Sequence, residues 1–161
     1  MKKVTNLFVL AVMLTATAIM FSSCGEDDGV MPLPQASNVS FKVDNLSEDL
    51  LTFYDVTVTY KDLNGVSHTD KIDGHSWEYK EGDGPSDAPI SCTAVAELKS
   101  EYKVPEKNNF EISYHYSVHY YKPSTTAKSE NPEITTLTFK IEDMQDFFSK
   151  HNKIVIMNVN R

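Results

Sequence analysis

The sequence predicts an all-β protein, namely a single antiparallel β-sandwich of about seven or eight strands with one short helix before the last strand. Apolar and polar residues alternate along many short stretches, which is typical of strands with one buried face. Clusters of Gly, Pro, Asn and Asp separate these stretches at short intervals, as turns do. Helical spacing of apolar residues occurs in one stretch near the C-terminus.

Four strands are predicted in the first half of the domain. Val39, Phe41 and Val43 share one face of the first strand, while polar residues lie between them. The next three strands are expected at residues 54–60, 66–72 and 75–80. Asn64-Gly65 is expected to form the turn after the second strand, because this pair adopts the positive φ angles of a tight hairpin, and Asp73-Gly74 is expected to turn the chain again after the third.

The second half begins with a polar stretch, residues 81–89, which predicts a flexible loop. Strands are then expected at residues 92–98, 112–120 and 134–141, with a long polar loop at 122–133. Met144, Phe147 and Phe148 have helical spacing and predict a helix over 142–150. Residues 153–160 are apolar on both faces, which predicts a central or doubly covered strand.

Two sandwich topologies fit this order of elements, immunoglobulin-like and transthyretin-like. A small lipocalin-like β-barrel also uses about eight strands and is the alternative fold.

The N-terminus has the organisation of an export signal. Lys2 and Lys3 precede an apolar run of 15 residues, Leu7 to Phe21, which is too short to cross a bilayer, a task that needs about 20 apolar residues. Small residues then lead to Cys24. Residues 1–23 are therefore predicted to be a signal peptide.

Phe21-Ser22-Ser23-Cys24 resembles a bacterial lipobox, although most lipoboxes have Leu where this chain has Phe21. Glu26-Asp27-Asp28 is similar to the export tag of surface-exposed lipoproteins of Bacteroidetes. The resemblance implies that Cys24 is lipidated and holds the protein in the bilayer of the outer membrane, facing the cell surface. A domain that faces the periplasm is the alternative. Residues 24–37 then form an acidic, proline-bearing tether, and residues 38–161 form the β-sandwich domain.

The chain contains two cysteines, Cys24 and Cys92. If Cys24 carries lipid, Cys92 has no partner. It alternates with Ala94 and Ala96, so we expect it to be a small buried residue. A Cys24–Cys92 disulfide in a secreted protein is the alternative.

Charge excludes some partners. Removal of residues 1–23 takes away Lys2 and Lys3 and changes the formal net charge from −8 to −10. Nucleic acids need clustered Lys and Arg, yet the only arginine is Arg161. We therefore expect no nucleic-acid partner.

No motif of a known catalytic site is present, so the protein is predicted not to be an enzyme and to need no cofactor. His115 and His119 lie on the same strand face but about 13 Å apart, too far to share one metal ion. Residues 81–87 contain Glu81, Asp83 and Asp87, whose carboxylates are candidate calcium ligands. The residue order of a dedicated calcium loop is missing.

Four residues are candidate ligand contacts. Tyr121 is expected on the polar face of its strand together with His115 and His119, and Trp77 is the only tryptophan. An exposed Trp or Tyr beside polar groups can stack a sugar ring or contact a protein partner, so a glycan or a protein is the expected partner. A core position for Trp77 is the alternative.

The sequence thus predicts a membrane-anchored lipoprotein with a non-enzymatic binding or structural role. One alternative is a fimbrillin-like adhesion or assembly subunit, since fimbrillin-type proteins also combine a lipobox with transthyretin-like sandwiches. The other is a ligand-carrying barrel or a hydrolase.

Overall fold

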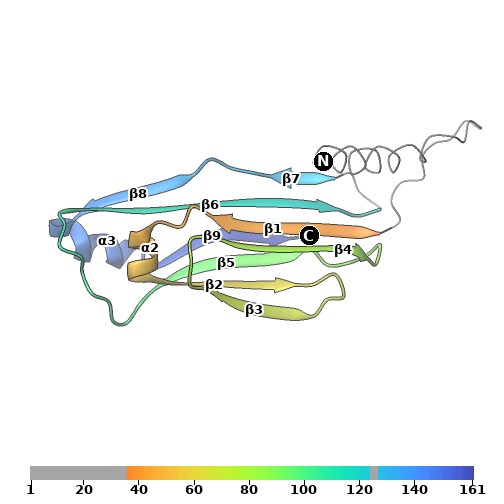
Figure 1. Cartoon of the computed structure of the whole chain (residues 1–161), viewed down its shortest axis with the longest axis horizontal. Helices are drawn as coiled ribbons and strands as arrows, with labels where there is room; N and C mark the ends of the chain where they lie inside the picture. Colours follow the sequence, from red (N-terminus) through yellow and green to blue (C-terminus); the bar gives the residue numbers. More distant parts are fainter. Residues whose placement is uncertain (1–35, 124–126) are drawn as a thin grey trace, which may run out of the picture. The chain divides into compact units, whose positions relative to one another are not determined.

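The computed structural model describes residues 36–123 and 127–161 (Figure 1). The predicted signal peptide at 1–23, Cys24 and almost all of the tether at 24–37 lie outside the described residues. Within the described ranges the chain forms two separate antiparallel sheets, which confirms the predicted β-sandwich. The alternative of a closed lipocalin-like barrel is wrong for this part of the chain. No helix among these residues has the length and apolar character needed to cross a bilayer.

The first sheet, sheet A, has the strand order β4-β1-β6, and β7 and β8 both pair with the long β6. Figure 1 shows β7 and β8 following one another along the same side of β6. The strands of sheet A are β1 (Ser37–Asp44), β4 (Trp77–Gly84), β6 (Asn109–Tyr121), β7 (Lys128–Glu130) and β8 (Thr135–Lys140).

The second sheet, sheet B, has the order β3-β2-β5-β9. Its strands are β2 (Tyr54–Lys61), β3 (Ser67–Ile72), β5 (Ser91–Leu98) and β9 (Lys153–Asn160).

The last strand, β9, is an edge strand, so the prediction of a central or doubly covered strand is wrong. A register shift places Ala94 opposite Met157 and Val95 opposite Val155, which leaves Ile156 as an extra, bulged residue. Because of this bulge, Ile156 and Met157 are both buried although they are adjacent in sequence. Val155 lies on the other face and is 54% exposed.

The core lies between the two sheets and consists of the inward residues of the alternating strands. Phe41 and Val43 of β1 face inward from sheet A, and Val56 and Val58 of β2 face inward from sheet B, all four fully buried. Burial of each such side chain contributes about 1.5–3 kcal/mol. At the end of the sandwich that carries the helices, several phenylalanines make ring contacts with one another: Phe53, Phe110, Phe139, Phe147 and Phe148.

Three short helical segments join strands of the two sheets. The predicted helix over 142–150 is present as a 3-10 turn, η1 (Ile141–Asp143), followed by α3 (Met144–Lys150), with Phe147 and Phe148 buried. The helix α2 (Glu48–Phe53) was not predicted, and it connects β1 to β2.

Two predicted loops contain strand residues. The expected loop at 81–89 is wrong at its start, because β4 continues to Gly84 and pairs there with Ser37 of β1. The expected loop at 122–133 contains β7. The predicted turn at Asn64-Gly65 is present, and Gly65 has a φ of 84°, in the left-handed region that glycine tolerates.

Candidate functional site

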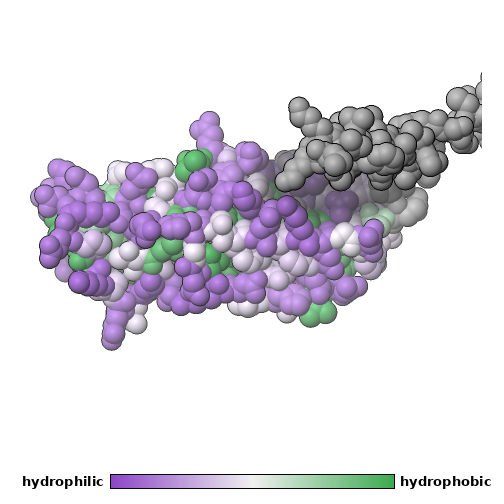
Figure 2. Space-filling view, viewed as in Figure 1, coloured by the Kyte–Doolittle hydropathy of each residue, from purple (hydrophilic) through white to green (hydrophobic). Residues whose placement is uncertain are grey.

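The outer face of sheet A carries a row of polar side chains from β6. Alternation places Glu111, Ser113 and His115 on this face, while the residues between them point into the core. In the view of Figure 2 the described surface is mostly hydrophilic, and its apolar residues form small, separated patches. Two hollows lie along this polar row, and both are lined by Glu111.

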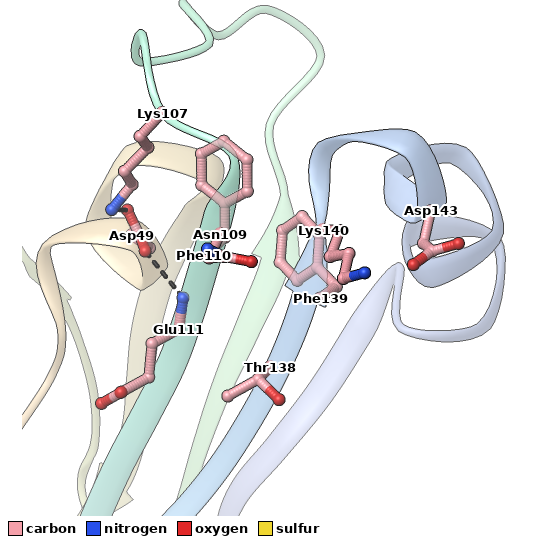
Figure 3. A pocket seen from close by; sticks show the side chains of 9 residues that line it. All are labelled: Asp49, Lys107, Asn109, Phe110, Glu111, Thr138, Phe139, Lys140 and Asp143. Atoms are coloured by element: carbon pink, nitrogen blue, oxygen red, sulfur yellow. Dashed lines mark hydrogen bonds and ion pairs between the residues drawn. The ribbon is translucent and has the colours of Figure 1, made fainter.

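The first, the Asp49 hollow, has a volume of about 610 Å³. Figure 3 shows Asp49 and Lys107 on one side of it and Asp143 on the other. Its lining residues come from α2, from the segment before β6, from β6 and β8, and from η1: Asp49, Lys107, Asn109, Phe110, Glu111, Thr138, Phe139, Lys140 and Asp143.

The second, the Asp44 hollow, has a volume of about 800 Å³. It lies where β1 ends and where the chain enters β4 and β8. Its lining residues are Lys42, Asp44, Asn45, Leu46, His75, Ser76, Glu111, Ser113, Ile134 and Thr136.

Side chains at the start of α2 hold the part of β6 that extends beyond the end of β1. The Ser47 hydroxyl caps α2 by accepting a hydrogen bond from the Leu50 amide, accepts another from the Ser113 amide, and donates to the Glu111 carbonyl at 2.8 Å. The Asp49 carboxylate accepts from the Glu111 amide at 2.7 Å. Polar side chains thus replace a neighbouring strand, and they fix the backbone of Glu111 on the side facing α2.

Asp49 is a buried charge, only 5% exposed. A buried carboxylate is tolerated when it is paired and hydrogen-bonded, and Lys107 Nζ lies 2.6 Å from Asp49 Oδ1. The same ammonium lies 5.2 Å from the centre of the Phe110 ring, within cation–π distance. One wall of the Asp49 hollow is therefore a fixed, internally neutralised ion pair.

Asp44 organises the second hollow. Its carboxylate lies 2.6 Å from His115 Nδ1 and 2.5 Å from Lys42 Nζ. Partial burial pushes the pKa of Asp44 upward, but the hydrogen bonds from Lys42 and His115 outweigh it, so the pKa lies below its usual value. His115 is held between β1 and β6 by this contact, with its side chain 14% exposed.

His75, at the rim of the Asp44 hollow, is fixed through both ring nitrogens. Its Nδ1 lies 2.6 Å from the Leu46 carbonyl oxygen, and its Nε2 lies 3.1 Å from Glu48 Oε1. The hydrogen bond to the Leu46 carbonyl, followed by the charge of Glu48, raises the pKa of His75 above 6.5. His75 therefore holds a proton more readily than a free histidine does.

Three of the four candidate ligand contacts share one face, as the alternation predicted. His115, His119 and Tyr121 belong to the outward-facing set of β6, and His119 lies opposite Ser40 of β1 and Ser129 of β7. Trp77 lies on β4, half-buried and packed against the core. The three β6 residues therefore share a face but are spread along the strand, and Trp77 lies apart from them on β4.

Trp77 belongs to an aromatic cluster that fills the gap between the edge strands β3 and β4. Its Nε1 donates to Asp70 at 2.9 Å, and its ring lies 5.3 Å from that of Tyr60. Tyr60 also contacts Tyr79, at 4.4 Å, and His68, at 5.2 Å between ring centres. These contacts indicate that Trp77 mainly closes this side of the sandwich.

The residues proposed as calcium ligands are not gathered around a common point. The Glu81 carboxylate accepts hydrogen bonds from the Tyr79 hydroxyl and from the Leu63 amide. Burial, followed by the contact with Glu81, raises the pKa of Tyr79. Within residues 36–123 and 127–161, no group of three or more His, Cys, Asp or Glu side chains could hold a metal ion.

Cys92 is fully buried on β5, as its alternation with alanines predicted, and its thiol has no disulfide partner among the residues that the structure describes. Burial raises the pKa of this thiol to about 12, so the reactive thiolate is scarce at neutral pH.

The sequence did not identify Asp49, Lys107 or Glu111 as site residues. Ser47 followed by Glu48 and Asp49 is a recognisable helix start, with a capping residue and acids in the first turn. That signal predicts α2, but it does not reveal that Asp49 reaches β6, which is 62 residues away in sequence.

Comparison with protein-family models, with curated proteins and with solved structures gives no match to this chain.

Proposed function

We propose that this protein is a lipid-anchored, non-enzymatic binding module of the outer membrane, displayed at the cell surface and tethered through Cys24. The anchor is supported by the charged start, the short apolar run and the lipobox-like Phe21-Ser22-Ser23-Cys24. Several acyl chains, each contributing about 0.8 kcal/mol per buried methylene, would hold the protein on the membrane. The acidic residues after Cys24 support export to the surface.

The binding role rests on one observation, the two hollows on the outer face of sheet A that share Glu111 as a lining residue. Their walls are fixed by the contacts of Ser47, Asp49 and Asp44, so a ligand would meet side chains that are already positioned. The two hollows meet at Glu111, an exposed acidic residue. We therefore place the binding face over β6 and β8.

Site-specific photocrosslinking in living cells tests this role. A photoreactive residue at Thr138, an exposed β8 position that lines the Asp49 hollow, is expected to give covalent adducts with envelope components. The matched control is Thr59, an exposed position on β2 of sheet B, where few adducts are expected. Equal adduct yields at the two positions, or none at Thr138, would contradict the placement of the binding face.

A further inference from the structure

The side of β8 that faces away from β6 has free backbone groups. The amides of Glu111 and Ser113 point toward Asp49 and Ser47, on the α2 side of β6. Because backbone groups alternate in direction along a strand, the N–H and C=O groups of Phe110, Ile112 and Tyr114 point toward β8. They lie opposite Phe139, Leu137 and Thr135.

The intervening residues of β8 therefore direct their N–H and C=O groups away from the sheet. These residues are Thr136, Thr138 and Lys140. Within the described part of the chain, β8 pairs only with β6, and no hydrogen bond to the outward groups of Thr136 and Thr138 is present, whereas Lys140 is the N-terminal cap of η1. Unpaired edges of this kind accept strands from other chains.

The composition of β8 does little to block such pairing. Edge strands are usually protected by prolines, bulges or several charges. Its sequence, Thr-Thr-Leu-Thr-Phe-Lys, has no proline and one charge, and β-branched threonines favour strand structure. By contrast, β4 at the other edge of sheet A carries Glu78, Lys80, Glu81 and Asp83.

Exposed isoleucines flank β8 at both ends. Ile134, just before the strand, is 54% exposed and lines the Asp44 hollow. Ile141, just after it, is 47% exposed and lines a smaller hollow with Asn109 and Lys140. A strand lying along β8 would cover apolar surface at both of its ends.

The charges around β8 favour a basic ligand. The lysines that line the two hollows are already paired: Lys42 with Asp44, Lys107 with Asp49, and Lys140 with Glu142. Two carboxylates of the same walls, Glu111 and Asp143, have no cation partner among the described residues. An approaching positive charge would therefore be attracted to Glu111 and Asp143.

We propose that an extended segment of a partner protein, bearing a lysine or arginine near its middle and apolar residues near its ends, adds to sheet A as a new strand beside β8. This inference rests on the proposed binding role of the same face. Thr138 lies opposite Glu111, so a basic residue beside Thr138 lies about 10 Å, two strand spacings, from the backbone of Glu111. The extended side chains of Lys and Glu together cover that separation.

A second copy of this chain fits the edge less well. Two copies would bring the same unpaired acids together, and the mature chain carries a formal charge of −10. A glycan could use the polar hollows but has no backbone N–H groups to pair with Thr136 and Thr138. Dimer formation identifies a second copy as the occupant, and crosslinking without peptide binding identifies a ligand such as a glycan.

The test uses the protein purified from the cell envelope in detergent and three labelled nine-residue peptides of alternating Val and Thr, studied by fluorescence anisotropy. The first peptide has Lys at its centre, and the second has Glu. The third also has Lys at its centre, but the backbone amides that would face β8 are N-methylated. We expect the Lys peptide to bind about tenfold more tightly than the Glu peptide. The N-methylated peptide is expected to lose binding, since it cannot donate the strand hydrogen bonds.

Variants of the protein complete the test. Glu111→Gln is expected to remove most of the preference for Lys over Glu. Glu78→Gln is the matched control, because Glu78 lies on the same face but on β4, beside Lys80, and it should leave the preference unchanged.

Three results would overturn the inference: absence of peptide binding, equal binding of the N-methylated peptide, or a dimer whose formation excludes the peptides. If peptide binding fails while photocrosslinking at Thr138 succeeds, the binding role stands with a ligand of another class, such as a glycan. If both fail, the proposed binding role of this face is wrong as well, while the lipid anchor is tested separately by intact mass.

Discussion

Gly84 shows how closely one residue is fitted at the end of β4. A Cβ atom built on Gly84 would lie 2.5 Å from Leu63 Cβ and 2.6 Å from Leu63 Cδ1, closer than carbon atoms can pack. Leu63 belongs to the turn between β2 and β3 and is 1% exposed, and its amide donates to the Glu81 carboxylate. Leu63 therefore fastens this turn to β4, and only glycine leaves room for it.

We expect Gly84→Ala to lower the free energy of unfolding by about 1–3 kcal/mol, because Leu63 must move and its turn with it. The matched control is Gly82→Ala in the same strand, where nothing lies within 4 Å of the new Cβ. That change should stay within about 0.5 kcal/mol. Urea denaturation of both variants measures the difference. Equal free energies of unfolding would show that the packing of Leu63 does not require glycine at position 84.

Among the elements, α2 has a role beyond connecting two strands, because its first residues replace a strand beside β6. The Ser47 hydroxyl makes three hydrogen bonds, one within α2 and two to β6. Loss of a cap typically costs about 0.5–2 kcal/mol, and each unsatisfied buried group adds about 1–3 kcal/mol.

Ser47→Ala is therefore expected to destabilise the domain by about 2–3 kcal/mol and to increase the amide exchange of Ser113, whose N–H donates to the Ser47 hydroxyl. Ser149→Ala in α3 is the control, since the exposed Ser149 hydroxyl bonds only the Asp146 carbonyl of its own helix. Hydrogen exchange followed by NMR measures both effects. If Ser47→Ala leaves the exchange of the Ser113 amide unchanged, the Ser47 side chain does not support β6.

Alternation predicted most strands and the outward face of β6, because a half-buried strand imposes a period of two on its sequence. The six residues of α2 are too few to show a helical period, so this helix was missed. The edge position of β9 was hidden by its bulge, which buries two adjacent apolar residues and imitates a strand covered on both faces. The Asp49 hollow depends on contacts between distant segments, and no local pattern encodes these.

At the scale of the whole molecule, its many carboxylates make stability depend on pH. The pKa of Asp62 is lowered, chiefly by the hydrogen bond from His68, and that of Asp44 is lowered by Lys42 and His115 despite partial burial. A carboxyl whose pKa is lower in the folded state contributes stability above its unfolded value of 3.8, and this stability is lost as the pH falls through the folded value.

We therefore expect the domain to keep its stability from pH 7 down to about pH 4 and to lose stability below that. Asp44→Asn should lower stability at pH 7 and reduce the fall between pH 4 and pH 2, because that position no longer titrates. Thermal unfolding at a series of pH values measures both. If the stability of Asp44→Asn falls as steeply with decreasing pH as that of the wild type, Asp44 is not a source of the acid sensitivity.

The most direct test of the lipid-anchored account is the intact mass of the protein extracted from cell membranes, compared with that of a Cys24→Ala variant. The account predicts a mature chain that begins at Cys24 and carries the added mass of acyl chains, and a variant that lacks both the cleavage and the lipid. The complementary measurement is protease treatment of intact cells, which should remove the wild-type domain if it faces outward. A wild-type protein without lipid, or one in which Cys24 is bridged to Cys92, would contradict the account.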